Sequence, residues 1–199
     1  MEKCNEEHQN KTYHNSRRGV TSFNKYDSEL VFQKMNLQKG DVFVDLGCGA
    51  GDYSMYASKL VGSKGYVYAV DIQKEALESL NEEIKKLSLD NIETIENNLC
   101  EALKLKSNCT DHCFMATVMH GEKLSKECKS LFSEIKRVLK LGGQLTIVEL
   151  KKEETPFGPP YDMRISPEEL EAGITSYGFR KTAYTDLGFF YMMTFKNNK

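Results

Sequence analysis

The sequence predicts an α/β fold in which helices cover both faces of a mostly parallel sheet. Short β-branched and aromatic runs alternate with longer amphipathic segments, which is typical of repeated strand and helix units. The first such run, Val42–Asp45, is followed by glycines at alternate positions, and the second, Tyr66–Asp71, also ends in an acid. In a parallel sheet, glycine turns and acids at the carboxyl ends of strands bring the backbone close to a ligand.

Length and composition favour one domain. The chain has 199 residues, 40% of them hydrophobic, and a net charge of −2 with acids and bases interspersed. We expect a single domain over residues 27–199, preceded by a mobile arm or lid over residues 1–26, which are polar and lack periodicity. No basic field for nucleic acid and no polybasic patch for a membrane is present. Because no signal-peptide core or membrane-spanning stretch is found, we expect a cytoplasmic protein.

The first elements follow from local pattern. Residues 27–35 combine apolar positions at helical spacing with a Gly-Asp pair beyond their end, which indicates a short helix. The run over 42–45 is β-branched and aromatic, so it is predicted to be a buried strand. Residues 53–61 then form the helix after the glycine turn, and the Gly-Ser-Lys-Gly sequence at 62–65 is a second turn.

The middle of the chain repeats the same alternation. Residues 66–71 are the second strand, and residues 74–87 place their leucines and isoleucine on one helical face with Glu and Lys on the other. A third strand is predicted over 92–96 and a fourth over 112–116. Residues 126–139 carry an apolar stripe at helical spacing and are predicted to form a helix.

The carboxyl-terminal part of the chain has a different sequence pattern. After a fifth strand over 145–149, all four prolines fall within residues 156–167, and the run at 155–161 must be a stiff loop because proline lacks a backbone donor. A Ser-Pro-Glu-Glu sequence from position 166 then opens a helix to about residue 177. Two runs, 179–186 and 189–195, flank a Leu-Gly pair and are predicted to be antiparallel strands.

The glycine spacing separates two kinds of nucleoside cofactor. A dinucleotide fingerprint needs glycines at its first and third positions and Gly or Ala at its sixth. Gly47 and Gly49 fit, but the sixth position is Asp52, whose carboxylate repels a pyrophosphate. A nicotinamide-dependent oxidoreductase is therefore the disfavoured alternative.

The pattern Asp45-x-Gly47-x-Gly49-x-Gly51 resembles the first motif of the class I S-adenosylmethionine-dependent methyltransferases. The resemblance extends over roughly residues 36 to 195 and is strongest to the methyltransferase-11 and quinone-biosynthesis type. It implies a Rossmann-like seven-stranded sheet that is completed by the antiparallel carboxyl-terminal hairpin. It also implies S-adenosylmethionine as cofactor, whose ammonium and sulfonium suit an acidic loop.

The resemblance assigns roles to particular residues. It places Asp45 and the glycine loop against the methionine portion, Asp71 at the ribose hydroxyls, and Asn98 with Leu99 at the adenine. The cofactor-binding residues expected in this way are Asp45, Gly47, Cys48, Gly49, Gly51, Asp71, Ile72, Asn98, Leu99 and Ala116. Simpler roles remain open: the glycines as a tight turn, Cys48 as a small packing residue, and Asp71 as the N-cap of the following helix.

Methyl transfer from a sulfonium depends mainly on alignment and water exclusion, so no conspicuous catalytic constellation is required. A base is needed only for a neutral oxygen or carbon acceptor, and the candidates are His120, beyond the fourth strand, and Glu149, at the end of the fifth. His120 is otherwise a polar loop residue, and Glu149 is otherwise a partner for Lys151 or Lys152.

Metal binding is not expected. Cys109 and Cys113 enclose Asp111 and His112, but strand alternation sends neighbours to opposite faces and the spacing matches no common zinc site. The sequence therefore predicts a methyltransferase that acts on a small molecule, with no metal and no nucleic-acid or membrane partner. A non-catalytic protein that binds the cofactor and regulates a partner is the remaining alternative.

Overall fold

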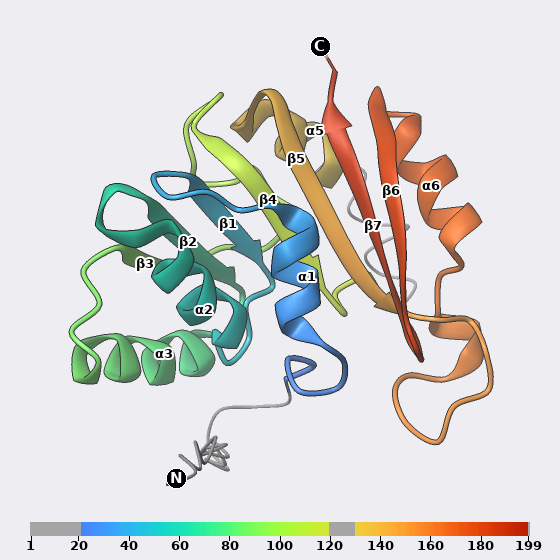
Figure 1. Cartoon of the computed structure of the whole chain (residues 1–199), viewed down its shortest axis with the longest axis horizontal. Helices are drawn as coiled ribbons and strands as arrows, with labels where there is room; N and C mark the ends of the chain where they lie inside the picture. Colours follow the sequence, from blue (N-terminus) through green and yellow to red (C-terminus); the bar gives the residue numbers. More distant parts are fainter. Residues whose placement is uncertain (1–20, 120–129, 199) are drawn as a thin grey trace, which may run out of the picture.

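The structure, a computed structural model, describes residues 21–119 and 130–198. It contains a seven-stranded sheet in the order β3-β2-β1-β4-β5-β7-β6 (Figure 1). Strands β1 to β5 are mutually parallel, whereas β7 runs antiparallel to both β5 and β6. The strands are β1 Val42–Leu46, β2 Tyr66–Asp71, β3 Ile92–Glu96, β4 Thr110–Ala116, β5 Leu139–Leu150, β6 Phe179–Leu187 and β7 Phe190–Asn197. The predicted fold class is confirmed.

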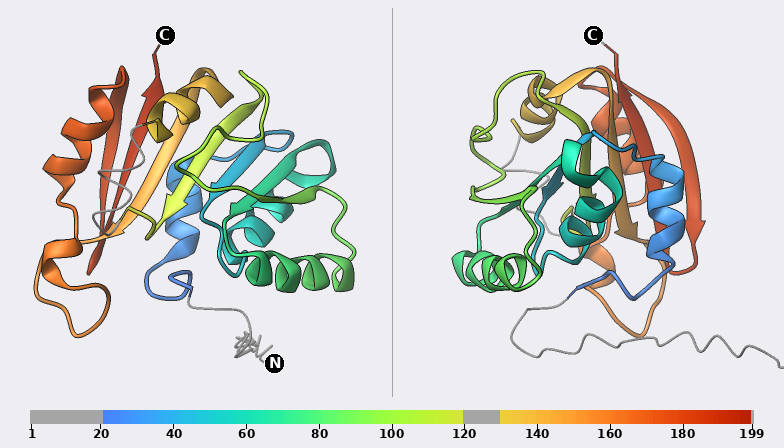
Figure 2. Two further views of the ribbon diagram at one scale, coloured as in Figure 1. Left: turned by 180° about the vertical axis from the view of Figure 1, so that it is seen from behind. Right: turned by 60° about the vertical axis from the view of Figure 1, so that its left-hand side comes forward.

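Helices cover both faces of this sheet (Figure 2). One face carries α1, α2 and α3, and the other carries α5 and α6. The helices are α1 Ser28–Met35, α2 Asp52–Val61, α3 Lys74–Lys86, α5 Leu131–Val138 and α6 Pro167–Thr175, with short 3₁₀ turns η1 at Gly62–Lys64 and η2 at Tyr161–Met163. No helix in the described part of the chain is long and apolar enough to cross a membrane.

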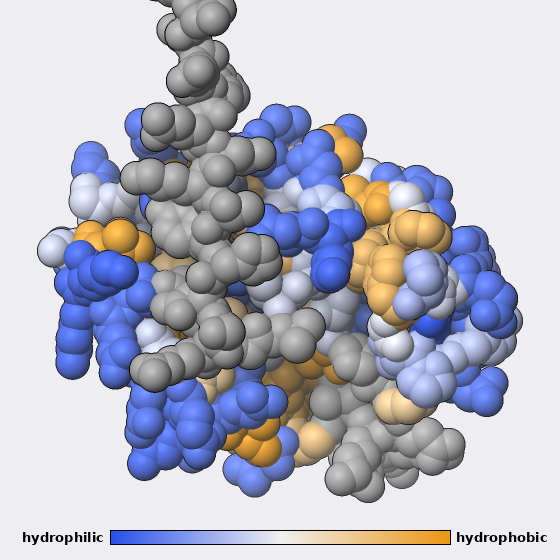
Figure 3. Space-filling view, turned by 90° about the horizontal axis from the view of Figure 1, so that it is seen from below, coloured by the Kyte–Doolittle hydropathy of each residue, from blue (hydrophilic) through white to orange (hydrophobic). Residues whose placement is uncertain are grey.

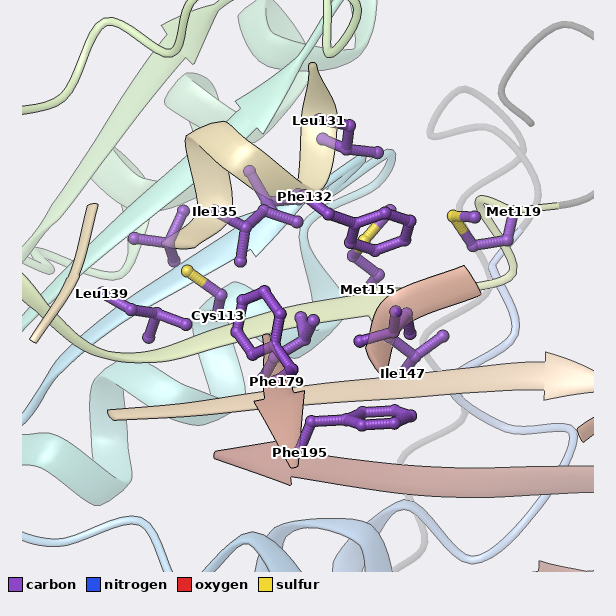
Figure 4. Packing of buried hydrophobic residues seen from close by; sticks show 14 of the residues in the cluster. Cys113, Met115, Met119, Leu131, Phe132, Ile135, Leu139, Ile147, Phe179 and Phe195 are labelled. Carbon is purple, nitrogen blue, oxygen red and sulfur yellow. The ribbon is translucent and has the colours of Figure 1, made fainter. Parts of the chain in front are cut away.

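Alternation along the strands divides the core in two. Phe43 and Phe114 point to the α1, α2 and α3 face, whereas their neighbours Val44, Cys113 and Met115 point to the other. Figure 4 shows this second layer, where side chains from α5 interdigitate with those of β4 to β7. A parallel strand that is buried on both faces has little room for charged residues, and the buried acids Asp45, Asp71 and Glu149 lie in the last two positions of their strands.

Helix starts follow local chemistry. Asp27 caps α1 by accepting a hydrogen bond from the Leu30 amide at 2.9 Å. Ser166 begins α6 with a full capping box, in which its hydroxyl and the Glu169 carboxylate each accept from the other residue's amide. The predicted acid-rich start of this helix is thereby confirmed.

The largest departure from the sequence prediction is in β5. The strand was expected only over residues 145–149, but β5 begins at Leu139. Leu139 pairs with Thr110 on β4, and a register shift follows before the pairing resumes at His112 and Gln144. Gly142 supplies a φ of 75° inside this irregularity. The Gly142-Gly143 pair therefore lies in a bulge within a longer strand.

The predicted arm over residues 1–26 is described only at its end. Residues 21–26 pack on α2, where the Phe23 ring lies 5.0 Å from that of Tyr53 and the Tyr26 and Tyr53 hydroxyls form a hydrogen bond. These six positions are part of the folded unit, and residues 1–20 lie outside the described residues.

Candidate functional site

A cavity of about 680 Å³ opens at the carboxyl ends of β1, β2 and β4. The strand order reverses between β1 and β4, and such a reversal is where open α/β sheets bind their ligands. Figure 3 looks onto this edge of the molecule, where hydrophobic residues are exposed among hydrophilic ones. Eight of the ten predicted cofactor residues line the cavity: Gly47, Cys48, Gly49, Asp71, Ile72, Asn98, Leu99 and Ala116.

The three glycines of the loop are required for different structural reasons. All have positive φ, at 78°, 49° and 78° for Gly47, Gly49 and Gly51. A Cβ on Gly51 would lie 2.4 Å from Leu80, so this glycine allows α3 to pack on the loop and does not line the cavity. A Cβ on Gly49 would meet nothing within 4 Å. Gly49 therefore presents bare backbone to the cavity.

Asp71 connects the glycine loop to the start of α3. One carboxylate oxygen accepts from the Gly49 amide at 2.8 Å and the other from the Gln73 amide at 2.9 Å. The side chain is largely buried yet lines the cavity. Each oxygen keeps further acceptor capacity, which suits a pair of sugar hydroxyls. The alternative in which Asp71 is the N-cap of the helix is wrong, because Gln73 occupies that position.

Asp45 lies beneath the loop, with only 1% of its surface exposed, and does not line the cavity. It accepts a hydrogen bond from the Ser54 hydroxyl at 2.6 Å. Burial raises the pKa of the Asp45 carboxyl to about 7, and the nearby Asp71 and Asp52 add to that increase. Asp45 thus supports the loop through Ser54, and its contact with the methionine portion stays a prediction.

The cavity has an acidic character. Burial, followed by the charges of Asp45 and Asp71, raises the pKa of the Cys48 thiol above its usual range. No Lys, Arg or His is found among the described residues that line the cavity. A ligand with positive charge would be favoured here, because it would offset the carboxylates.

The opposite end of the cavity combines apolar and amide groups. Ile72 is 60% exposed beside it, and Leu99 is almost buried. The Asn98 side-chain oxygen accepts from the Cys100 amide at 3.0 Å, which fixes its direction. A second lone pair on that oxygen is able to accept from an exocyclic amine.

The structure describes one of the two predicted catalytic residues, Glu149. Glu149 is 2% exposed, does not line the cavity, and accepts from the Met119 amide at 2.6 Å, so it holds the segment after β4. Lys151 and Lys152, its expected partners, bind Asp186 and Glu169. His120 lies outside the described residues.

Eight further lining residues were not predicted, among them Thr117 and Val118 directly after β4. The further lining residues are Thr21, Ser22, Ala50, Tyr53, Gln73, Cys100, Thr117 and Val118. Tyr53 shares a hydrogen bond with the Ser22 hydroxyl at 3.1 Å, and Thr117 lies 3.5 Å from the same hydroxyl. Tyr53 could have been identified from its position two residues after the last glycine of the motif, whereas nothing in the sequence indicated that Ser22 would contact it.

Thr117 has a φ of 55°, and among the described non-glycine residues with positive φ it is the one that is β-branched. This conformation costs a β-branched residue on the order of 1–3 kcal/mol. Its amide donates to the Val148 carbonyl at 2.8 Å and its hydroxyl to the Ala116 carbonyl at 2.7 Å. The turn at Thr117 places Val118 in contact with Gly47. A Cβ added to Gly47 would lie 2.6 Å from a Val118 methyl carbon.

Metal-ligating residues do not gather in the described part of the chain. Within residues 21–119 and 130–198, no group of three or more His, Cys, Asp or Glu is placed to hold a metal ion. The Asp111 carboxylate forms an ion pair with the Lys140 ammonium at 2.8 Å. The His112 Nε2 atom lies 3.1 Å from the Asp41 carboxylate, near the amino-terminal ends of β1 and β4 and therefore away from the cavity.

Comparison with known proteins gives consistent results. The family model for a methyltransferase domain matches residues 37–184. A solved S-adenosylmethionine-dependent methyltransferase from Aquifex aeolicus is 32% identical, with a TM-score of 0.81 over 90% of this chain and 94% of that one.

Curated relatives include demethylmenaquinone methyltransferases. The protein from Oceanobacillus iheyensis is 28% identical over 68% of this chain and 56% of its own length. The one from Listeria welshimeri is 30% identical over 61% and 50%. The chain thus spans about half the length of the curated relatives it matches. The family model covers most of the chain and includes the glycine loop, Asp71 and Asn98, so this protein belongs to the class I S-adenosylmethionine-dependent methyltransferases.

Proposed function

We propose that this protein transfers a methyl group from S-adenosylmethionine to a neutral small molecule. The observation that carries the proposal is the acidic cavity at the strand-order reversal, where Gly49 presents bare backbone and Asp71 presents a carboxylate. When bound, the cofactor supplies a methyl group on a positively charged sulfur leaving group. The Asp45 and Asp71 carboxylates favour such a cation.

In this proposal the described residues bind and orient the cofactor. Asp71 accepts from the ribose hydroxyls while its bonds to the Gly49 and Gln73 amides keep the carboxylate fixed. Ile72 and Leu99 contact the adenine faces, and Asn98 accepts from the adenine amine. Asp45 supports the loop through Ser54. Alignment of the acceptor and exclusion of water then supply most of the catalysis.

A small-molecule acceptor is supported by two observations. The described lining has no basic side chain that would bind a nucleic-acid backbone, and the net charge of the chain is −2. The curated relatives are named for a small-molecule acceptor, demethylmenaquinone. A ring-containing acceptor with hydroxyl or carbonyl groups fits the hydroxyl-lined β4 side of the cavity.

Calorimetric titration with S-adenosylmethionine and S-adenosylhomocysteine tests the proposal. We expect both to bind at micromolar concentrations, and Asp71→Ala to weaken them by about tenfold or more, since it removes a buried acceptor. Glu78→Ala, on the exposed face of α3, is the matched control and leaves binding unchanged. Absence of binding to the wild-type protein would overturn the proposal. Binding without methyl transfer to any of a panel of phenols, quinols, amines and thiols would favour a non-catalytic role.

A further inference from the structure

The sheet topology divides the cavity into two ends. Asp71 and Asn98 lie after β2 and β3, whereas Thr117 follows β4, and β1 with its glycine loop lies between them. Two strand spacings separate β2 from β4, a distance of about 10 Å. A cofactor with its nucleoside at β2 and β3, as proposed above, therefore has its reactive end toward β4. The acceptor must approach from that side.

Neutral hydroxyl groups define the β4 side. Ser22 and Tyr53 are within hydrogen-bond distance of each other at 3.1 Å, and the Thr117 hydroxyl is 3.5 Å from that of Ser22. All three residues line the cavity. The Thr117 hydroxyl donates to the Ala116 carbonyl and so offers a ligand its acceptor lone pairs. The Ser22 and Tyr53 hydroxyls are able to donate or to accept, so the group matches either a hydroxyl or a carbonyl oxygen. An anionic acceptor would lose its hydration here without a cationic partner among the described lining residues.

The hydroxyl groups are held rigidly. The Tyr53 ring is enclosed by Phe23 at 5.0 Å and Phe114 at 4.9 Å between ring centres, and its hydroxyl also bonds that of Tyr26. Burial raises the pKa of Tyr53 to about 12, so the phenol keeps its proton at neutral pH. A fixed ring with a protonated hydroxyl orients a ligand without losing side-chain entropy.

Thr117 adds a second, independent observation. A β-branched residue with φ of 55° is a strained choice at a position where glycine would be relaxed. Glycine there would remove the hydroxyl that lies beside Ser22. Strained residues of this kind concentrate at ligand sites, where the surrounding structure maintains them.

We propose that Ser22, Tyr53 and Thr117 form the acceptor subsite and bind the oxygen of an uncharged, hydroxyl- or carbonyl-bearing ring compound. This proposal rests on the proposed methyltransferase function, because that function is what requires an acceptor beside the reactive end of the cofactor. The three residues act as binding and positioning groups. They set which acceptors enter, and they hold the acceptor oxygen near the β4 end of the cavity.

The test uses 1-naphthol as a neutral probe and 1-naphthoate as its anionic counterpart, each titrated into protein saturated with S-adenosylhomocysteine. We expect 1-naphthol to bind more tightly than 1-naphthoate. Tyr53→Phe and Thr117→Val, which keep the ring and the β-branch, each weaken 1-naphthol by about fivefold, the effect of one lost hydrogen bond. Tyr56→Phe, one turn along α2 and outside the cavity lining, is the matched control and changes nothing.

S-adenosylhomocysteine affinity is measured for the same variants, and thermal unfolding confirms that each one folds. The proposal expects this affinity to stay within about twofold of wild type, since the hydroxyl groups lie at the acceptor end. If Tyr53→Phe weakens S-adenosylhomocysteine instead, the hydroxyls belong to the cofactor subsite and the proposal is overturned. Wild-type protein that binds S-adenosylhomocysteine but prefers 1-naphthoate also overturns it. Wild-type protein that binds no S-adenosylhomocysteine refutes the proposed function itself, and this result is distinguishable from the other two.

Discussion

Replacement of Asp45 by Asn should make the protein less sensitive to alkaline pH. Asp45 is buried under the glycine loop, and its pKa rises from 3.8 to about 7 chiefly through burial. Between these values the folded state holds a proton that the unfolded state has released. The free energy of unfolding must therefore fall as pH rises through this range, and the effect is complete above about pH 7.

The size of the effect follows from the pKa difference. Each unit of pKa corresponds to about 1.4 kcal/mol, so the buried Asp45 carboxylate lowers the free energy of unfolding by about 4 kcal/mol between pH 3 and pH 8. From pH 5 to pH 8 alone the loss is about 3 kcal/mol. In wild type the Ser54 hydroxyl donates to an Asp45 carboxylate oxygen at 2.6 Å. An Asn side chain does not titrate, and its amide oxygen is still able to accept this hydrogen bond.

Urea unfolding at pH 5 and pH 8 measures the effect. Other groups titrate equally in both proteins, so the difference between wild type and Asp45→Asn isolates this carboxyl. Glu78→Gln, on the exposed face of α3, is the control and should keep the wild-type pH dependence. The same loss of stability in wild type and Asp45→Asn would refute the reasoning. As a second readout, S-adenosylmethionine should bind wild type up to about tenfold more tightly at pH 8 than at pH 6, because the cation favours ionised Asp45.

Other substitutions separate stability from binding. Gly51→Ala should lower the free energy of unfolding by about 1–3 kcal/mol, since its Cβ would meet Leu80 at 2.4 Å. Gly49→Ala should cost only about 1 kcal/mol of unfolding free energy from its positive φ but weaken S-adenosylmethionine by about tenfold, because it adds a methyl group to backbone that lines the cavity. Urea unfolding and calorimetry compare the two variants. Ser166→Ala should cost about 1 kcal/mol through loss of the capping box, and unchanged urea unfolding would contradict this. Glu149→Leu should cost about 1–3 kcal/mol in urea unfolding, because the buried Met119 amide loses its acceptor, whereas Glu149→Gln, which keeps that acceptor, should retain most of the stability.

Strong local patterns made much of the fold predictable. The bounds of β2 and β3 agree with the sequence prediction, because each is a short run rich in β-branched or aromatic residues between clear turn signals. The amino-terminal part of β5 was missed, since its pairing with Thr110 depends on a partner distant in sequence. Local propensity carries no information about such a contact.

The candidate site was predictable in its motif but not in its geometry. Spacing identified the glycine loop and Asp71. It did not reveal that Asp45 turns away from the cavity toward Ser54, since that depends on how β1 and α2 are packed. The approach of Ser22 to Tyr53 was equally inaccessible, because 31 positions separate them and no repeating pattern links them.

The insertion of β7 between β5 and β6 has a consequence for how the chain folds. Tyr191, Met193 and Phe195 are fully buried, so β5 lacks a neighbour on that side until the carboxyl-terminal hairpin docks. An undocked β5 would present unpaired backbone groups and apolar side chains, a template for association with another chain. In the finished sheet the outermost strand is β6, whose Arg180 and Lys181 are exposed and oppose such pairing. The hairpin is thus the element on which the solubility of folding intermediates depends.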